Sequence, residues 1–490
     1  DGNVQLTRDG GTSWTNVTGN LKGVPKASWV SWIEASRHDA ATAYATFDRH
    51  TFGDHDPWVY VTRDYGKSWQ PLVTPQDARG IRGYAHVIRE DAQTPNLLFL
   101  GTELGLWISI DGGQSWAGFK GDKFPAVAVR DLAIQPRDND LVIATHGRGI
   151  WIIDDITPLR ALSTDLMSRE AAFVTARPVQ QRISGPGGWA NGAAVFVGEN
   201  PPGGAVLTYY QRTRHLFGPL KLEILDASGR VVDELPASKR RGLNRIEWSM
   251  REKPPRVPPA VQLAFAGTQG PRVLPGTYTA RMTKGGQVYE HKFDVGLDRR
   301  ASFTVEQRKQ QYDAAMRVHR LFGEETAVLD RIQQLRAGVA AAGANTAVDA
   351  ATKTKLAAFE AKLDDVRKRI VATKEGGAIT GEERLREHTD LLYGAIMGYE
   401  GAPGAYQVER ISVLQAELVD IEQQFERLVA ADLPAVNQAL QYAGQPPITA
   451  PAKVPAMADA GISSANAHWL STRKRKDRKS MFHSLPQDAV

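Results

Sequence analysis

The side chains best suited to chemistry in this sequence are tryptophans, arginines, a glutamate and a histidine in its first third. Indole rings offer flat apolar platforms, and guanidinium and carboxylate groups form directional, charge-assisted hydrogen bonds. Such groups together suit the recognition of a sugar or of a peptide carboxylate. The candidate ligand-binding residues are Trp29, Trp32, Glu103, Arg130, His146 and Arg148. No spacing among them defines a catalytic pattern, so no catalytic residue is assigned.

A second group of polar residues lies close together, between residues 48 and 58. This segment contains Asp48, His50, Asp54, His55 and Asp56. Imidazole and carboxylate groups can bind Zn²⁺ or Ca²⁺. Their spacing matches no compact metal motif, so we expect a polar, solvated loop and predict neither a metal nor a cofactor, with metal binding by this loop left as the alternative. The chain has no cysteine, which excludes thiolate metal sites, thiol nucleophiles and disulfides.

The elements that must position these residues are indicated by a short pattern that occurs three times. Each copy reads Ser/Thr-x-Asp-x-Gly-x-Ser/Thr-Trp. The constrained residues are Asp9, Gly11 and Trp14 in the first copy, Asp64, Gly66 and Trp69 in the second, and Asp111, Gly113 and Trp116 in the third. The copies recur about every 50 residues, the spacing expected of one β-propeller blade per copy. A degenerate fourth copy ends at Asp154, where the glycine and tryptophan are absent.

Each copy of the pattern is expected to form a turn between two strands. The aspartate carboxylate can accept hydrogen bonds from backbone N–H groups of its own turn. The glycine adopts a positive φ at little cost, and the tryptophan can pack between adjacent blades. These roles are structural, so we predict that the three aspartates form turns and are not catalytic acids.

Periodicity and composition divide the chain into four parts. Residues 1–158 are predicted to be propeller blades, and the alternating segments and turns of residues 159–300 predict an Ig/FnIII-like β-sandwich. Apolar residues at helical spacing predict a small α-helical bundle over residues 301–443. Residues 444–490 are predicted to be a disordered basic tail. The expected fold class is therefore mainly β: a partial β-propeller, then a β-sandwich, then a helical bundle.

Charge and hydropathy argue against a membrane-spanning segment and against a nucleic-acid partner. No apolar run is long enough to span a membrane. The net charge of +5 is small for 490 residues, and much of it lies in a basic run at residues 473–479. No aromatic residues are interleaved with this run, so we expect no nucleic-acid partner.

The repeats and the sequence around them resemble the BNR/Asp-box, sortilin-type β-propeller family of exported bacterial proteins, which are often labelled glycosyl-hydrolase-like. The matching stretches include residues 29–36, 42–48, 96–103 and 145–151. The resemblance implies an exported protein, periplasmic, cell-surface or extracellular, that binds a polypeptide or glycan ligand. About three and a half blades cannot close a ring. We therefore expect this chain to be a C-terminal fragment, its propeller completed by blades N-terminal to Asp1, with any signal peptide there too.

The same architecture predicts where a ligand binds. In a four-stranded blade the repeated turn joins the third and fourth strands on one face. The opposite face carries the second-to-third turns, expected at residues 47–58, 102–106 and 145–150, and the starts of the innermost strands, expected near residues 29–32, 83–86 and 126–130. The six candidate residues fall in these segments. We therefore predict a ligand-binding face opposite the repeats, with the β-sandwich and helical domains as accessories.

The alternative function is a glycoside hydrolase of the sialidase kind, its site completed by the missing blades. By resemblance, such an enzyme needs three arginines around a substrate carboxylate, a Tyr–Glu nucleophilic pair and an aspartic acid. The residues available are Arg82, Arg130 and Arg148 for the arginines and Tyr84 with Glu34 or Glu103 for the pair. Peptidase activity is a poor fit, because the chain has neither a nucleophile elbow nor a His-Glu-x-x-His helix.

Overall fold

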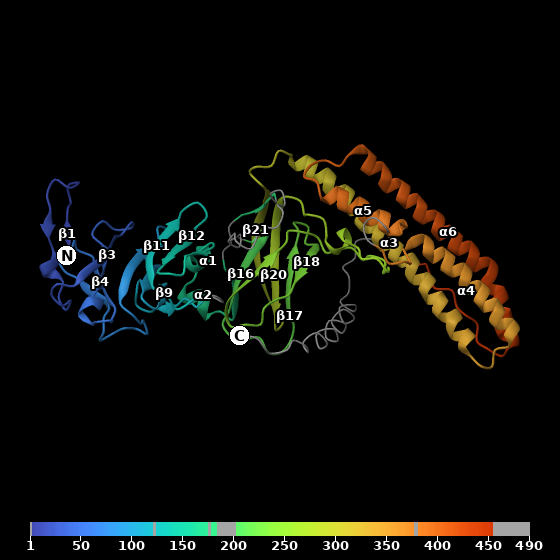
Figure 1. Cartoon of the computed structure of the whole chain (residues 1–490), viewed down its shortest axis with the longest axis horizontal. Helices are drawn as coiled ribbons and strands as arrows, with labels where there is room; N and C mark the ends of the chain where they lie inside the picture. Colours follow the sequence, from blue (N-terminus) through green and yellow to red (C-terminus); the bar gives the residue numbers. More distant parts are fainter. Residues whose placement is uncertain (1, 121–123, 175–177, 184–201, 377–380, 454–490) are drawn as a thin grey trace, which may run out of the picture.

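The computed structural model describes residues 2–120, 124–174, 178–183, 202–376 and 381–453. The molecule is elongated, with a series of sheets at the N-terminal end, two further sheets in the middle and long helices at the other end (Figure 1). The prediction of a mainly β chain followed by helices is confirmed. Most of the predicted basic tail, including residues 473–479, lies outside the described residues. Within the described ranges, no helix has the length and apolar character needed to cross a membrane.

The N-terminal region is a series of antiparallel sheets whose strands pair in chain order. The first is a two-stranded sheet of β1 (Gln5–Leu6) and β2 (Thr15–Asn16). The second contains β3 (Trp29–Ala35), β4 (Ala43–Asp48), β5 (Trp58–Thr62) and β6 (Gln70–Val73). The third contains β7 (Ala85–Glu90), β8 (Leu98–Thr102), β9 (Gly105–Ser109) and β10 (Ala117–Gly118). The fourth contains β11 (Val129–Gln135), β12 (Asp140–Thr145) and β13 (Ile150–Ile153).

Successive sheets pack face to face. Strand β8 is an example, because it is buried along its whole length between two neighbouring sheets. Side chains alternate between the two faces of a strand. Leu98 and Leu100 therefore pack towards the preceding sheet, whereas Phe99 packs towards the following one. Gly101 lies at a close contact between the third and fourth sheets, since a Cβ there would be 2.7 Å from the Val129 carbonyl oxygen. This close packing holds the strand ends of neighbouring sheets together.

The three repeated turns have the same hydrogen bonds. In the second turn the Ser68 backbone N–H and hydroxyl donate to the two Asp64 carboxylate oxygens at 2.9 and 2.6 Å, and the Gly66 N–H donates to the Thr62 hydroxyl at 2.8 Å. The first and third turns repeat these contacts. In the first, hydrogen bonds from Ser13 lower the pKa of Asp9 to about 2. The contacts support the prediction that these aspartates form turns.

The tryptophans of the three turns differ in burial. Trp69 is 8% exposed and packs against the first two sheets, as expected of a residue between blades. Trp14 is 60% exposed, which differs from that expectation. The reason is that β1 and β2 form only a two-stranded sheet, and the described part of the chain places no apolar core around Trp14.

Two sheets form the middle of the molecule after short helices α1 (Thr157–Arg160) and α2 (Thr164–Ser168). One sheet has the order β14 (Ala171–Val174), β16 (Ala205–Gln211), β19 (Gly242–Trp248). The other has the order β15 (Val179–Gln181), β21 (Gln287–Leu297), β20 (Gly276–Lys284), β17 (Leu220–Leu225), β18 (Val231–Leu235). Both sheets contribute to one apolar core that contains Trp248, so they form a sandwich.

The helical region contains α3 (Val305–Ala344), α4 (Ala350–Ile370), α5 (Leu385–Met397) and α6 (Ala405–Tyr442). Helix α3 begins at a capping box in which Thr304 and Gln307 bond reciprocally. Its buried side chains, such as Val318, Phe322 and Leu329, follow helical spacing and pack with the other three helices. Three 3₁₀ turns complete the described elements: η1 (Thr18–Asn20), η2 (His50–Phe52) and η3 (Ala266–Thr268).

One carboxyl group in the core of the helical region makes the stability of that region depend on pH. Glu325 of α3 is fully buried, with one oxygen accepting from the Thr389 hydroxyl at 2.6 Å. Burial raises the pKa of Glu325 to about 8. The unfolded chain releases this proton near pH 4.3, about the usual value for glutamate, whereas the folded chain keeps it. The Glu325 contribution therefore favours folding most at low pH and is lost as pH rises from about 4 towards 8.

We expect the Glu325→Gln variant to remove this pH dependence. Wild type should lose up to about 1.4 kcal/mol of unfolding free energy per pH unit in that window, and the variant markedly less. Denaturant unfolding at a series of pH values, followed by the helical circular-dichroism signal, measures how the unfolding free energy changes with pH. Glu409→Gln, at an exposed position of α6, is the matched control and should behave as wild type. Equal pH slopes for all three proteins would contradict the prediction.

Candidate functional site

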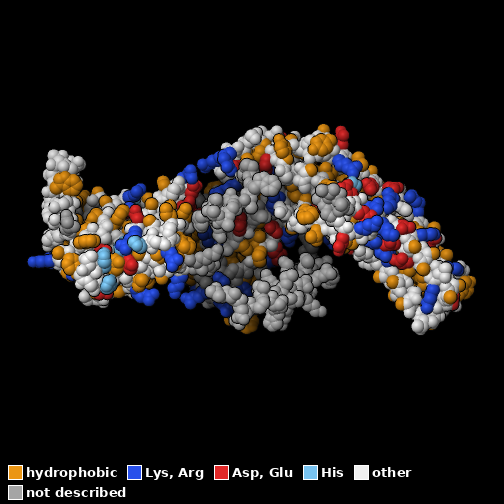
Figure 2. All heavy atoms as spheres, viewed as in Figure 1, with side chains coloured by type: hydrophobic (Ala, Val, Ile, Leu, Met, Phe, Trp, Pro, Cys, Tyr) orange, Lys and Arg blue, Asp and Glu red, His pale blue; other side chains and the backbone are white. Residues whose placement is uncertain are grey.

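Polar side chains gather at one end of the N-terminal strands, opposite the repeated turns. In each antiparallel sheet the start of the innermost strand lies beside the end of the second strand. The repeated turns join the third and fourth strands at the other end. Figure 2 shows histidine and charged side chains together on the surface of this region. The group is called the polar cluster here and comprises Asp48, His50, Tyr84, His86, Glu103 and Arg130.

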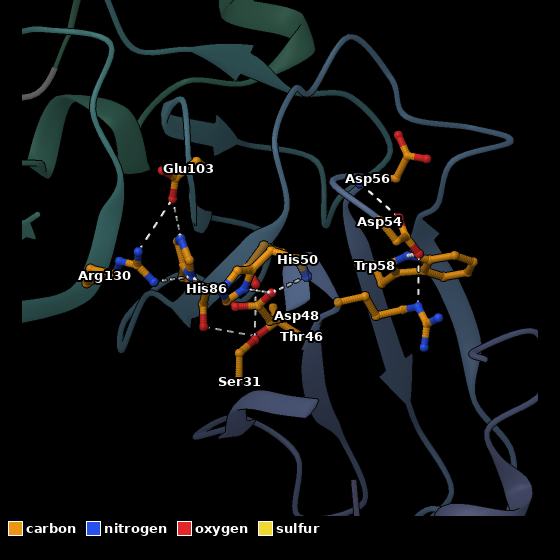
Figure 3. A network of polar contacts seen from close by, with 12 residues as sticks. Ser31, Thr46, Asp48, His50, Asp54, Asp56, Trp58, His86, Glu103 and Arg130 are labelled. Atoms are coloured by element: carbon orange, nitrogen blue, oxygen red, sulfur yellow. Dashed lines mark hydrogen bonds and ion pairs between the residues drawn. The ribbon is translucent and has the colours of Figure 1, made fainter. Parts of the chain in front are cut away.

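His86, at the start of β7, is the centre of the polar cluster (Figure 3). Its Nε2 lies 3.1 Å from Glu103 Oε2, and its Nδ1 lies 3.2 Å from Arg130 Nη1. Arginine can only donate, so Nδ1 accepts and Nε2–H donates to Glu103, which defines the neutral tautomer. Burial lowers the pKa of His86, in agreement with a neutral ring.

Glu103 and Arg130 form the solvent-facing part of the polar cluster. Glu103 lies in the turn between β8 and β9, and Arg130 lies at the start of β11. Their side chains are 36% and 40% exposed, and Arg130 Nη2 is 3.6 Å from Glu103 Oε2. Partial burial opposes ionisation of Glu103, but hydrogen bonds from His86 and Tyr84 keep its pKa below the usual value. The site therefore presents an ionised carboxylate and a guanidinium side by side.

The other half of the cluster is a set of stacked rings held by Asp48. The buried Asp48 carboxylate lies 2.7 Å from His50 Nδ1, accepts from the His50 backbone N–H at 2.9 Å, and lies 3.9 Å from His86 Nδ1. The His50 ring stacks on Tyr84 with centroids 4.9 Å apart, and its other neighbour is the edge of Trp29 at 6.2 Å. Trp29 is 49% exposed. An exposed indole thus lies beside His50, whose ring stacks on Tyr84.

Asp54 uses its carboxylate within the loop of residues 48–58. Asp54 accepts from Arg49 Nε at 2.9 Å and from Trp58 Nε1 at 3.1 Å (Figure 3). The first turn of this loop is the 3₁₀ helix η2. Gly53 ends the helix with a φ of 74°. In the part of the chain that the structure describes, no three His, Asp or Glu side chains are placed to hold a metal ion.

The structure brings together two of the six candidate residues, Glu103 and Arg130, and Trp29 contacts the polar cluster through His50. Trp32 lies elsewhere, since its Nε1 donates to Glu34 at 3.3 Å and its ring stacks under Arg89 between two sheets. A β-bulge at Ser31 shifts the register of β3 against β4 between Val30 and Trp32.

His146 and Arg148 lie in the exposed turn between β12 and β13. The His146 backbone N–H donates to the Ala128 carbonyl at 2.9 Å, and the Arg148 carbonyl accepts from Trp151 Nε1 at 3.0 Å. Among the contacts of the described residues, none joins either side chain to Glu103 or Arg130. Their part in a binding site stays a prediction.

Four members of the cluster were not among the six ligand-binding candidates: Asp48, His50, Tyr84, which was named only for the hydrolase alternative, and His86. Asp48 and His50 were assigned to a solvated loop, although Asp48 is buried. Tyr84 and His86 fall in the segment 83–86 that was expected to start an innermost strand. The contact of His86 with Glu103 is seen only in the structure, since a lone histidine carries no spacing that marks it as a site residue.

Fold and site together define a β-rich protein of repeated antiparallel sheets with a polar cluster at one end of the strands. No family model matches the sequence, and no curated protein matches it. Solved structures with partial similarity include a GH74 enzyme of Niastella koreensis, with 18% identity, a TM-score of 0.21, and coverage of 26% of this chain and 21% of that one.

Two further structures are similar over more of this chain. One is an ancestral GH74 enzyme, at 13% identity and a TM-score of 0.26, covering 60% of this chain and 38% of that one. The other is PorZ, a bacterial surface component of the type-IX secretion system of Porphyromonas gingivalis, at 14% identity and a TM-score of 0.18, covering 54% and 30%. This chain spans well under half the length of each of the three. At these TM-scores the similarities carry no argument about function.

Proposed function

We propose that this chain is part of an exported, BNR/Asp-box, sortilin-type β-propeller protein that binds a polypeptide or glycan ligand through the face opposite the repeated turns. In this proposal residues 1–158 are propeller blades. Residues 159–300, an Ig/FnIII-like sandwich, and residues 301–443, a helical bundle, are accessory domains. Residues 444–490 are a basic tail. The observation that carries the proposal is the polar cluster, where Glu103 and Arg130 face solvent over a buried layer of Asp48 and His86.

The chemistry of the cluster supports ligand recognition. The Glu103 carboxylate accepts hydrogen bonds from hydroxyl or amide groups, and the Arg130 guanidinium donates to hydroxyl or carboxylate oxygens. Trp29 adds an exposed apolar ring against which a sugar or an apolar side chain can stack. His86 touches both charged groups and is itself held in place by burial. A polar pair whose geometry is set before binding loses little entropy when it captures a ligand.

Substituting the charged pair tests the proposed face. Glycan arrays and arrays of unstructured peptides would first identify a ligand, and isothermal titration calorimetry would then measure its affinity. We expect Glu103→Gln and Arg130→Gln each to weaken binding about 10-fold or more, since a hydrogen bond to a charged group contributes about 1.5–3 kcal/mol.

A matched control separates this effect from a general loss of charge. Arg63, an exposed arginine beside the second repeated turn, lies at the opposite end of the same strands and bonds to Gln70 at 3.3 Å. Arg63→Gln should bind as wild type does. Undiminished binding by the Glu103→Gln/Arg130→Gln double variant would place the ligand elsewhere.

A sialidase-like hydrolase is a second candidate, favoured by one contact. Tyr84 lies beside Glu103, the pairing that such an enzyme uses for its nucleophile. Against it, burial and the neighbouring carboxylate raise the pKa of Tyr84, so its hydroxyl keeps its proton at neutral pH. Arg82 and Arg148 are exposed, and neither takes part in the contacts described above for Tyr84 and Glu103. Turnover of a fluorogenic sialoside that Tyr84→Phe abolishes would favour the hydrolase over the binding protein.

A further inference from the structure

Three arginines converge where the sandwich meets the helical region. Arg251 follows β19 and Arg272 precedes β20, and the two residues form a β-bridge with each other. Arg308 belongs to the first turns of α3. All three line a small cavity together with Gln311, Tyr312 and Met397. Its volume of about 10 Å³ is close to the space that one water molecule requires.

Arg308 is the most buried of the three, at 2% exposure. Its two Nη atoms donate to Gln311 Oε1 and to Glu400 Oε2. Its Nε is buried and has no hydrogen-bond partner among the residues that the structure describes. Leaving such a donor unsatisfied costs about 1–3 kcal/mol, and more for a charged group. Arg308 therefore has an unused charged donor at the edge of the cavity.

The neighbouring polar groups cannot satisfy that donor. Gln311 uses its oxygen for Arg308 and its nitrogen for the Ile396 carbonyl at 2.8 Å. The Tyr312 hydroxyl donates to Glu252 at 2.6 Å, and Glu252 also binds Arg230 at 2.8 Å. The nearby acceptors are thus engaged in other bonds.

The charges around the cavity do not balance. Glu400 accepts from Arg308 and lies 2.8 Å from Arg272 Nη1, so one carboxylate serves two guanidiniums. Arg251 donates to the Gly270 carbonyl at 3.0 Å, and the described residues provide no ion pair for it. Burial and the charge of Arg272 lower the pKa of Arg251, yet arginine remains protonated in proteins. Three positive charges, that of the buried Arg308 and those of the partly buried Arg251 and Arg272, therefore share one negative charge.

We infer that this cavity binds a small monovalent anion of the halide type, with chloride as the physiological ligand. An anion supplies both the acceptor that Arg308 Nε lacks and the negative charge that the three guanidiniums lack. A neutral water would supply only the acceptor. The cavity volume favours a monatomic ion over phosphate or sulfate. The ion links β-sandwich loops to α3 and α5, so it acts as an electrostatic clamp between the two regions.

Bromide substitution and thermal unfolding of the full chain test this site. Crystals soaked in sodium bromide should show an anomalous peak within hydrogen-bonding reach of Arg308 Nε. Unfolding in sodium chloride should occur about 2–4 °C higher than in sodium gluconate of equal ionic strength. Arg251→Gln should remove most of this difference, because it removes a guanidinium that has no carboxylate partner among the described residues.

Arg256→Gln is the matched control. Arg256 lies on the same segment as Arg251 but is exposed and pairs with Asp330 at 2.6 Å. This variant should respond to chloride as wild type does. An equal chloride response in Arg251→Gln and Arg256→Gln would indicate a general salt effect and overturn the inference, as would the absence of bromide from the cavity. If Arg251→Gln fails to fold, the bromide experiment on wild type decides alone.

Discussion

Replacing Arg160 by methionine should lower the unfolding free energy of the N-terminal sheets by about 3–5 kcal/mol, because it leaves a buried carboxylate without its partner. Asp91, in the loop after β7, is 0% exposed. Arg160 of α1 donates to it from Nη2 at 2.7 Å and from Nε at 3.0 and 3.1 Å. Arg160 Nη1 also donates to Asn139 at 2.6 Å. The pair therefore ties α1 to the third and fourth sheets.

Urea unfolding followed by tryptophan fluorescence would measure this loss. The matched control is Arg137→Met, which removes an arginine with a 77% exposed side chain from its contact with Asp138 and should change stability by less than about 1 kcal/mol. An Arg160→Met/Asp91→Leu double variant should recover much of the stability, since an apolar pair leaves no unpaired buried charge. If Arg160→Met lowered the unfolding free energy no more than Arg137→Met, the buried pair of Arg160 and Asp91 would not stabilise the sheets as predicted.

The second large effect is expected at Trp248, in the core of the sandwich. Trp248 is 0% exposed, its Nε1 donates to the Arg251 carbonyl at 3.1 Å, and its rings contact Tyr278 and Phe293. Trp248→Ala removes these contacts and creates a cavity between the two sheets. Core substitutions of this size cost about 3–5 kcal/mol.

Calorimetry suits this variant, since a chain with several regions need not unfold in one transition. The Trp248→Ala protein should show a lower midpoint for the sandwich transition, and Trp248→Phe a smaller shift because it fills part of the cavity. Trp14→Ala, at a 60% exposed position, is the control and should leave that transition unchanged. A sandwich midpoint that survives Trp248→Ala would mean that the two sheets are held together elsewhere.

Much of the local structure could be predicted because it depends on contacts a few residues apart. The repeated turns are an example: Ser68 bonds to an aspartate four positions earlier, and the pattern of residue types is itself the hydrogen-bond scheme. The change from alternating to helical spacing likewise marks the passage from strands to α3–α6. The burial of each tryptophan is not contained in the pattern, because it depends on which sheet covers the turn.

The candidate site was predicted only in part, because it depends on contacts between residues far apart in the sequence. Glu103 and Arg130 were named because their segments were expected at the same ends of neighbouring strands, and they do meet. Their meeting point, His86, was missed, because a lone histidine carries no spacing that distinguishes a core residue from a site residue. Trp32 was included because its segment was expected to start an innermost strand, and the sequence does not show that its ring bonds to Glu34 and lies under Arg89.

The sequence by itself determined the repeated turns, the strand and helix periods and the absence of thiol chemistry, because residue types and short spacings suffice for these. Only the tertiary structure decided which side chains meet in the polar cluster and around the arginine-lined cavity. Arg130 reaches His86 across 44 residues of chain, and Arg308 reaches Glu400 across 92. Such contacts depend on how whole sheets and helices pack, which the local pattern does not encode.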